Sequence, residues 1–218
     1  PNYDRAISKW AIVKVNEDGT HTLVSHARYA DDVIAKYSAE KCEFKGKKGI
    51  AAGGGSKYIA DFDSLDVHSI TQNIVLSTII STTRGGGFTQ PYYYGGRTYY
   101  INTGSVAGYD ATLKAAQKKD IVVEAIILTP TGSGYTDPEC TGGYYTMPNM
   151  TTALATNYYA ASLDYLARRY STGENGRIHH WIMHNEVDQG DTWTNMGSQP
   201  EMRFYDRYIK SMRLCYNI

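Results

Sequence analysis

The chain has 218 residues, enough for one large domain with a small extension. Its 22 basic and 22 acidic residues balance, so we expect no electrostatic attraction to nucleic acid or to an anionic membrane surface. No apolar run approaches the ~18–20 residues of a membrane-spanning helix, so no membrane partner is expected either.

The first 46 residues are expected to form a β-hairpin that leads into the main domain. Alternation in Ala11–Val15 and again in Thr22–Ser25 predicts two strands. The segment between them contains EDGT, a sequence typical of hairpin turns. We therefore divide the chain into a lead-in, residues 1–46, and a larger domain, residues 47–218.

Strands alternate with helices after the lead-in. A short apolar strand in KKGIAAGGG precedes a β-branched strand over residues 68–80, a pattern typical of burial on both faces. A Gly- and Tyr-rich insertion over residues 81–104 is too polar for a core and long for a loop, which usually indicates function. A helix is predicted over residues 109–120 and a buried strand over residues 121–128.

The same order continues to the end of the sequence. A second Gly- and Tyr-rich loop spans residues 129–150, and an amphipathic helix is predicted over residues 152–170. The segment GRIHHWIMHNE supplies a fourth strand, and a last helix is expected to begin at Pro200.

This order of elements predicts an α/β fold with a parallel sheet and right-handed crossovers. The long loops follow the carboxyl ends of strands and the returning links are short, as in a (β/α)8 TIM barrel. We therefore expect about four βα units, the N-terminal half of such a barrel. A doubly wound open sheet is the alternative, but neither G-x-G-x-x-G nor G-x-x-x-x-G-K-[ST] follows a strand.

The fourth predicted strand ends in Asn185 and Glu186. Alternate residues of a strand share a face, so His180, His184 and Glu186 are expected to point the same way. Glu186 would then lie where barrel ligands bind, and partial burial among aromatic rings would let it donate a proton near neutral pH. Cleavage of a glycosidic bond needs such a donor and a second carboxylate opposite it, so Glu186 is the predicted catalytic residue.

Two other roles remain open for Glu186. It could form a structural ion pair with an arginine such as Arg84 or Arg203. It could also bind a divalent metal together with His184 and Asp188, although three ligands on one strand rarely converge. The second role is the weaker one, so neither a metal nor another cofactor is expected.

The aromatic composition suggests a surface that holds a polar ligand. The chain has 20 Tyr but only 4 Phe, and a tyrosine ring offers an apolar face together with a hydroxyl group. Half-exposed surface tyrosines are the alternative explanation, and a backbone-bonded buried amide is the alternative for Asn73. The predicted substrate contacts are Asn73, Tyr93, Tyr144, Asn185, Asp188 and Trp193.

Three stretches resemble a known family: YDATLKAAQKKDIVVEAIIL, YYAASLDYLARRYS and WIMHNEVDQGDTWTNMG. Together with an Asn-Glu pair that closes a fourth strand, they are similar to the clan-A (β/α)8 glycoside hydrolases, in an uncharacterised bacterial branch. The resemblance covers Lys47 to the C-terminus and implies that Glu186 is the acid/base of a retaining enzyme. Val187 and Asp188 stand where many members of the clan have Pro after the pair.

The resemblance also implies a nucleophile that this sequence does not contain. In the clan that residue is a Glu at the end of strand seven, whereas only about 170 residues follow Lys47 here and a barrel needs about 250. The remainder of a longer chain or a second copy is therefore expected to close the barrel.

The functional hypothesis is a glycoside hydrolase that acts on a poly- or oligosaccharide. A non-catalytic carbohydrate-binding barrel and a metal-dependent hydrolase are the alternatives. Polysaccharide-degrading relatives are commonly exported, which favours a secreted or extracytoplasmic location. Cys42, Cys140 and Cys215 have no CxxC spacing, which excludes a zinc ribbon, and one disulfide among them remains open.

Overall fold

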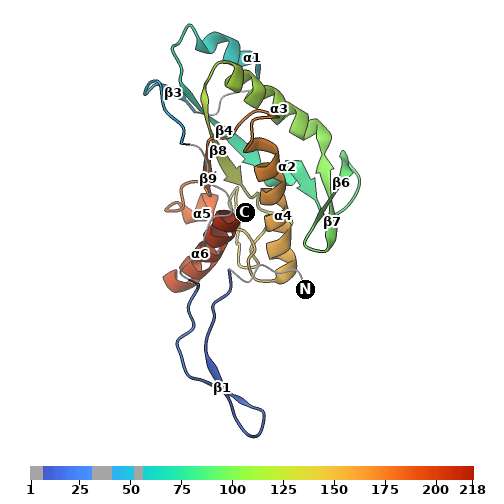
Figure 1. Ribbon diagram of the computed structural model, residues 1–218, viewed down its shortest axis with the longest axis vertical. Helices are drawn as coiled ribbons and strands as arrows, with labels where there is room; N and C mark the ends of the chain where they lie inside the picture. The colour runs from blue at the N-terminus through green and yellow to red at the C-terminus, as the bar shows by residue number, and fades with distance from the viewer. Residues whose placement is uncertain (1–6, 31–40, 52–55) are drawn as a thin grey trace.

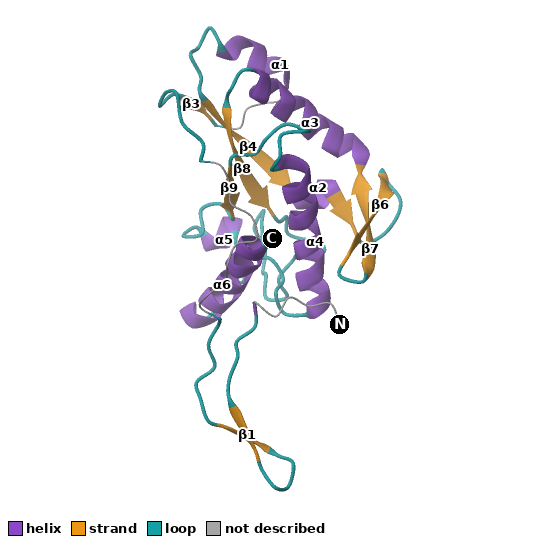
Figure 2. Cartoon of the chain, viewed as in Figure 1, coloured by secondary structure: helices purple, strands orange, loops and turns teal. Residues whose placement is uncertain are grey.

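The computed structural model describes residues 7–30, 41–51 and 56–218. It contains a parallel sheet, a small antiparallel sheet, a two-stranded hairpin, and helices that pack against the two sheets (Figures 1 and 2). The described strands are β1 (Val13–Val15), β2 (His21–Leu23), β3 (Gly49–Ile50), β4 (Ser69–Val75), β5 (Ile80–Ser81), β6 (Phe88–Tyr94), β7 (Arg97–Asn102), β8 (Val122–Leu128) and β9 (His180–Met183). The helices are α1 (Ser56–Ile59), the 3-10 helix η2 (Ala60–Phe62), α2 (Leu76–Ile79), α3 (Thr103–Lys118), α4 (Ala153–Tyr170), α5 (Gly190–Trp193) and α6 (Glu201–Asn217).

The parallel sheet has the strand order β3-β4-β8-β9, and every neighbouring pair in it is parallel. Its register aligns Thr71 with Glu124 and Glu124 with His180. The predicted strands over residues 68–80 and 121–128 and in the segment 176–186 are confirmed in kind, although each is shorter than expected. Strands of this order bring their carboxyl ends to one edge of the sheet.

Helices pack on one face of this sheet. Ile70, Ile74, Val123 and Ala125 alternate along β4 and β8 and are buried in the main core, together with side chains of α3, α4 and α6. The other face carries a more polar set, in which Thr71 and Glu124 are half-buried and Asn73 is exposed. The helix-covered face therefore supplies most of the hydrophobic stabilisation, at about 1.5–3 kcal/mol for each fully buried aliphatic side chain.

The expected half of a TIM barrel is wrong. The sheet is open, with β3 and β9 as its edge strands, and the described residues show no barrel-like series of alternating βα units. The insertion over residues 81–104, expected to be a loop, contributes β6 and β7, which join β5 in an antiparallel sheet of order β5-β7-β6. A second copy or a further length of chain was expected to close the barrel. That expectation depended on the barrel, which the structure does not show.

A hairpin signal in the insertion explains this error. Gly95 and Gly96 both have positive φ angles, of 57° and 81°, as the two central residues of a tight hairpin turn require. Tyr92 and Tyr99 pair across the strands, and Pro91 is tolerated because β6 is an edge strand. The repeated glycines obscured an alternation of inward and outward side chains that predicts strands.

Both long central helices begin with a side-chain cap. The Asn102 side chain accepts a hydrogen bond from the Ser105 backbone at 3.2 Å at the start of α3. Thr152 does the same for Ala155 at the start of α4, also at 3.2 Å. The helix predicted over residues 152–170 is confirmed, and the one predicted over residues 109–120 begins earlier than expected, at Thr103.

The lead-in hairpin is confirmed as β1 and β2, which extend away from the rest of the molecule (Figure 1). The Asn16 and Asp18 side chains hydrogen-bond within its turn, to Thr20 and Thr22. The three cysteines are free thiols, so none of the disulfides left open is present. Among the described residues, no helix is both long and apolar enough to cross a membrane.

Candidate functional site

The loops that follow β8 and β9 meet at the carboxyl edge of the parallel sheet. The Tyr145 backbone N–H donates to the Thr192 carbonyl at 3.0 Å, and the Asn195 N–H donates to the Tyr145 carbonyl at 3.2 Å. The Met147 N–H also donates to the Asn195 carbonyl, at 3.2 Å. We name the resulting region the carboxyl-edge surface and define it by Tyr144, Tyr145, Asn185, Glu186 and Trp193.

The Asn195 side chain forms hydrogen bonds with backbone groups of both loops. Its Oδ1 accepts hydrogen bonds from the backbone N–H groups of Thr141, at 2.8 Å, and Gly197, at 3.0 Å. Its Nδ2 donates to the Asp191 carbonyl at 3.0 Å. The residue is only 6% exposed, so water reaches these bonds poorly. An isolated asparagine gives no signal in the sequence, and this residue was not among the predicted ones.

Two glycines let the loop backbones approach closely. Gly143 has φ of 81°, and a Cβ on it would lie 2.4 Å from the Asp191 carbonyl oxygen. Gly197 has φ of 64°, and a Cβ on it would lie 2.7 Å from the Glu139 carbonyl oxygen. Any side chain at either position would push the loops apart.

The aromatic residues of this surface divide into a fixed pair and an exposed ring. Tyr145 and Trp193 stack with ring centroids 5.1 Å apart and an interplanar angle of 5°. Tyr144 beside them is 79% exposed. The structure therefore brings Tyr144 and Trp193, both predicted substrate contacts, to one surface, and one face of the Trp193 ring is occupied by Tyr145.

Other tyrosines are core residues rather than surface residues. Tyr135 stacks on Tyr158 at 4.3 Å between centroids, and Tyr158 stacks on Tyr99 at 5.7 Å. All three are buried, and the Tyr158 hydroxyl donates to the Ile80 carbonyl at 2.7 Å. The tyrosine-rich composition thus reflects a hydrogen-bonded aromatic core as well as an exposed surface.

Glu186 lies three residues beyond the end of β9 and its side chain is exposed. Its backbone φ is +41°, and that of His184 is +66°, values that a side chain with a Cβ rarely adopts. The Glu186 carbonyl accepts a hydrogen bond from Gln189 at 2.8 Å, and the Gln189 carbonyl in turn accepts from Trp193 at 3.1 Å. Strained backbone held in this way is typical of functional sites.

The predicted shared face of His180, His184 and Glu186 is wrong. The strand ends at Met183, and the left-handed backbone at His184 breaks the alternation. His180 and Glu186 are exposed, whereas His184 is buried, and its Nε2 lies 2.8 Å from the Ser211 hydroxyl of α6. The partial burial expected for the Glu186 carboxylate is not found.

The metal site considered for His184, Glu186 and Asp188 is not assembled. The His184 ring lies under α6 between Tyr159 and Tyr208, while the two carboxylates are exposed on the loop. Within residues 7–30, 41–51 and 56–218, no group of three His, Cys, Asp or Glu side chains is arranged to hold a metal ion. The alternative ion pair of Glu186 with Arg203 is also absent, because Arg203 pairs with Glu139.

We expect the stability of the protein to fall as the pH drops from about 6.5 to 4, because of His184. Burial lowers the pKa of His184 to about 4, so the unfolded chain binds the proton more tightly than the native one. This contribution is complete above the unfolded pKa and is lost as the pH falls toward the folded one, by up to about 3 kcal/mol. Chemical denaturation at pH 7 and pH 4 measures it. His184→Gln should show a smaller fall, and an equal fall in both proteins would contradict this assignment.

The remaining predicted substrate contacts lie in two groups, one beside Glu186 and the other away from it. Asp188 is exposed on the same loop as Glu186, and Asn185 is half-buried there. Asn73 is exposed on the face of the sheet opposite the one that packs against α3, α4 and α6, so the alternative of a buried amide is wrong. Tyr93 lies on the β6–β7 hairpin, which Figure 1 shows on the opposite side of α4 from α5. Asn73 and Tyr93 are therefore not part of the carboxyl-edge surface.

Two carboxylates, one buried and one half-buried, anchor the loop after β8 to α6, and neither was predicted from the sequence. Asp137 is buried, with its Oδ2 3.5 Å from Arg207 Nε, and Glu139 pairs with Arg203. Burial raises the pKa of the Asp137 carboxyl, and the Glu139 N–H and Arg207 act in the opposite direction. These pairs hold the base of the loop that carries Tyr144 and Tyr145.

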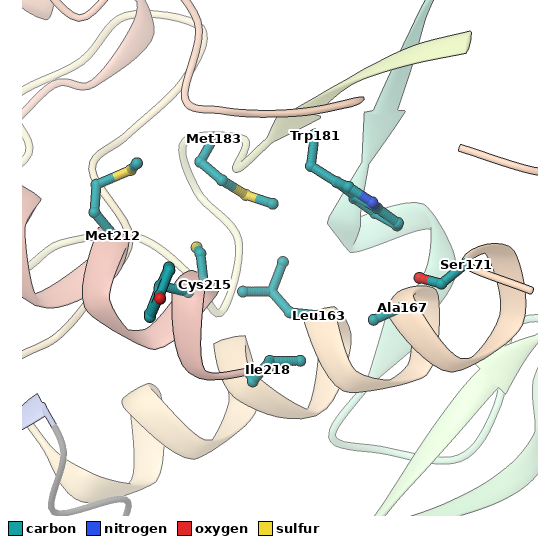
Figure 3. A pocket seen from close by; sticks show the side chains of 9 residues that line it. Leu163, Ala167, Ser171, Trp181, Met183, Met212, Cys215 and Ile218 are labelled. Carbon is teal, nitrogen blue, oxygen red and sulfur yellow. The ribbon is translucent and has the colours of Figure 1, made fainter. Parts of the chain in front are cut away.

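A pocket of about 340 Å³ lies between α4, β9 and α6 (Figure 3). Trp181 and Met183 reach it from β9, and Leu163 and Cys215 line it from the two helices. Burial raises the pKa of the Cys215 thiol to about 12, so this thiol is not a reactive nucleophile. None of the described residues that line the pocket has a carboxylate side chain, so the acid chemistry predicted for Glu186 is not located there.

Comparison with known proteins gives one match. No curated protein and no solved structure matches the chain. One family model matches residues 40–218, a range that contains the parallel sheet, the β6–β7 hairpin and the carboxyl-edge surface and leaves out the β1–β2 hairpin. The chain therefore belongs to the family of unknown function DUF5722.

Proposed function

We propose that the protein is a glycoside hydrolase that holds a saccharide on the carboxyl-edge surface and uses Glu186 as its general acid. The proposal combines a binding element, which is aromatic, with a chemical element, which is a carboxylate. Both lie in loops after the carboxyl ends of parallel strands, the edge at which ligands bind in open α/β sheets.

The aromatic element suits a sugar ring. The apolar C–H faces of sugars pack on aromatic rings, while tyrosine hydroxyls and amides bond the sugar hydroxyls. Tyr144 presents an exposed ring, and the Tyr145–Trp193 pair is held in place by backbone hydrogen bonds between the two loops and by the bond from the Thr141 N–H to Asn195 Oδ1. A rigid aromatic surface loses little conformational entropy when a ligand binds.

The observation that carries the proposal is the exposed carboxylate of Glu186 on a left-handed backbone at the carboxyl end of β9. Its side chain forms no ion pair or hydrogen bond with a described residue, so it is free to meet a ligand. Two backbone hydrogen bonds, through Gln189, connect it to Trp193. A constrained and unpaired acid next to an aromatic surface is a candidate for catalysis rather than for stability.

In the proposed reaction Glu186 donates its proton to the glycosidic oxygen as the C–O bond to the anomeric carbon breaks. The departing sugar leaves as an alcohol, and the positive charge that develops on the remaining sugar needs a second carboxylate. In a retaining enzyme that carboxylate lies about 5–5.5 Å from the acid and forms a glycosyl ester, which water hydrolyses with Glu186 acting as base.

A non-catalytic carbohydrate-binding protein is the second candidate. The exposure of Glu186 favours it, because the proton donor of a glycosidase is expected to be partly buried, and this side chain is not. A saccharide bound over Glu186 would exclude water from the carboxylate, as the hydrolase requires. A binding protein does not require this exclusion.

The two candidates differ in whether the wild type hydrolyses glycosides, and the Glu186→Gln variant tests the role of Glu186 in that hydrolysis. The wild type should release aryl alcohol from aryl glycosides or shorten a polysaccharide, and the variant should bind these ligands without cleaving them. A wild type that binds saccharides and cleaves none of them supports the second candidate, and hydrolysis at the same rate by the variant rules out the role of Glu186.

A further inference from the structure

One long segment of the chain contains no acidic residue. No Asp or Glu occurs between Asp66 and Asp110, although the chain has 22 acidic residues in all. The same segment contains Arg84 and Arg97 and forms β4, β5, β6 and β7. A protein with no net charge therefore has a region in which positive charge is not compensated locally.

The β6–β7 hairpin in this segment has an aromatic outer face. Tyr92, Tyr99 and Ile101 point inward to the core, so by alternation Pro91, Tyr93, Thr98 and Tyr100 point outward. Tyr93 pairs with Thr98 and Pro91 pairs with Tyr100, which makes the two outward tyrosines diagonal neighbours. Tyr93 is 72% exposed, although burying such a ring would be favourable.

The inward face of the hairpin packs against α4. The Tyr92 hydroxyl hydrogen-bonds Asp164 of α4, and the Tyr92 ring contacts Tyr165 edge to face at 5.2 Å between centroids. Tyr99 stacks on Tyr158 of the same helix. The outer face is thus a rigid platform on which an exposed ring keeps its position.

The charges around this platform are positive. Arg84 lies in the loop before β6, and Arg97 pairs with the inward-facing Tyr94 at the turn. The two arginines therefore lie at the two ends of the hairpin and not among the outward side chains of its face. Both are exposed, and neither forms an ion pair with a described residue. The nearest acids on the packed helices are already neutralised, because Asp164 pairs with Arg168 and Asp110 with Arg169.

We propose that the outer face of the β6–β7 hairpin binds an acidic polysaccharide, with the Tyr93 ring against a sugar and with Arg84 and Arg97 attracting its carboxylates. This rests on the proposed function and narrows its substrate class to chains that contain uronic acids. Stacking on tyrosine suits the sugar ring, and two flanking guanidinium groups suit acidic groups spaced along a chain. The hairpin lies apart from the carboxyl-edge surface, so it holds a distant part of the polymer.

A single-stranded nucleic acid is the other anionic polymer that stacks on aromatic rings. It carries a charge on every residue and is usually bound by a basic groove with many lysines and arginines. Here only two arginines flank the platform and the whole chain is neutral, which favours the more sparsely charged saccharide.

Affinity electrophoresis of the whole chain tests the proposal with matched ligands. Native gels contain polygalacturonate, its neutral methyl ester, alginate or no polymer. The wild type should be retarded by polygalacturonate or alginate more than by the methyl ester, and the retardation should decrease with salt. Tyr93→Ala should weaken binding about 3- to 10-fold, since a ring contact is worth roughly 0.5–1.5 kcal/mol.

Arginine variants separate specific binding from net charge. Arg84→Gln and Arg97→Gln should each weaken binding about 2- to 5-fold. Arg28→Gln is the matched control, because it removes the same charge from an exposed arginine outside the segment and should have no effect. Circular dichroism should show that all four variants fold like the wild type, because the changed side chains are exposed.

Three outcomes would overturn the proposal. They are no retardation by either acidic polymer, equal retardation of the wild type and Tyr93→Ala, and tighter Tyr93-dependent binding to an oligothymidylate. If Trp193→Ala abolishes saccharide binding and Tyr93→Ala does not, this inference fails and the proposed function stands. If Tyr93-dependent binding to an acidic polymer persists without any hydrolysis, only the hydrolase function fails.

Discussion

Glu186→Gln is expected to lower the turnover of glycosides by about 10²- to 10⁴-fold, the range that general acid catalysis contributes. Glutamine keeps the size and hydrogen-bonding ability of the side chain but cannot donate a proton to the leaving oxygen. The Glu186 side chain forms no hydrogen bond or ion pair with a described residue, so the change should leave the folded structure and saccharide binding intact. Initial rates on aryl glycosides with leaving groups of different acidity measure the effect, and the loss should be largest for the most basic leaving group.

Asp188→Asn is the matched control for this experiment. Asp188 is an exposed carboxylate on the same loop, two residues from Glu186, and its replacement removes the same charge. Asp188→Asn is expected to retain most of the hydrolytic activity. Similar losses in both variants would show that the loop acts through its charge alone, which contradicts a specific role for Glu186.

Asn195→Ala is expected to lower the free energy of unfolding by about 3–5 kcal/mol. The change removes three hydrogen bonds to backbone groups, each worth about 0.5–1.5 kcal/mol, and leaves buried backbone groups without partners at about 1–3 kcal/mol more. Because the bond from the Thr141 N–H joins the loop after β8 to Asn195 in the loop after β9, the Tyr145–Trp193 stack should also loosen. Urea denaturation measures the first effect and near-ultraviolet circular dichroism the second.

Asn149→Ala provides the comparison. The Asn149 side chain also accepts hydrogen bonds, from the backbone and side chain of Thr151, but it lies at an exposed turn of one loop. Its replacement should cost less than about 1 kcal/mol and leave the aromatic signal unchanged. Equal destabilisation by both changes would show that Asn195 does not join the loops.

Local patterns in the sequence predict the elements of this protein better than their assembly. β-branched runs identify β4 and β8, and apolar periodicity identifies α4. The barrel was wrong because helical and strand periods do not determine whether a sheet closes, which depends on strand tilt and on the packing of both faces. The Gly-Gly turn of the β6–β7 hairpin was present in the sequence, but its glycine-rich surroundings were taken as a loop.

The candidate site shows a similar division. The rule that polar residues after parallel strands meet at one edge places Glu186, Asn185 and Trp193 in one region. The rule of alternation failed at His184, because a left-handed residue reverses the direction of the chain and turns that side chain under α6. Asn195 could not be predicted, since its partners come from loops that only the folded structure brings together.

Binding of a saccharide next to Trp193 tests most directly whether the carboxyl-edge surface holds a sugar. The double variant Trp10→Phe and Trp181→Phe leaves Trp193 as the only tryptophan of the chain, so its fluorescence reports the carboxyl-edge surface alone. Titration with neutral and uronic-acid oligosaccharides should give a saturable change in emission for at least one of them, and Glu186→Gln in the same background should keep it. A folded double variant whose Trp193 emission responds to none of these saccharides would contradict the account.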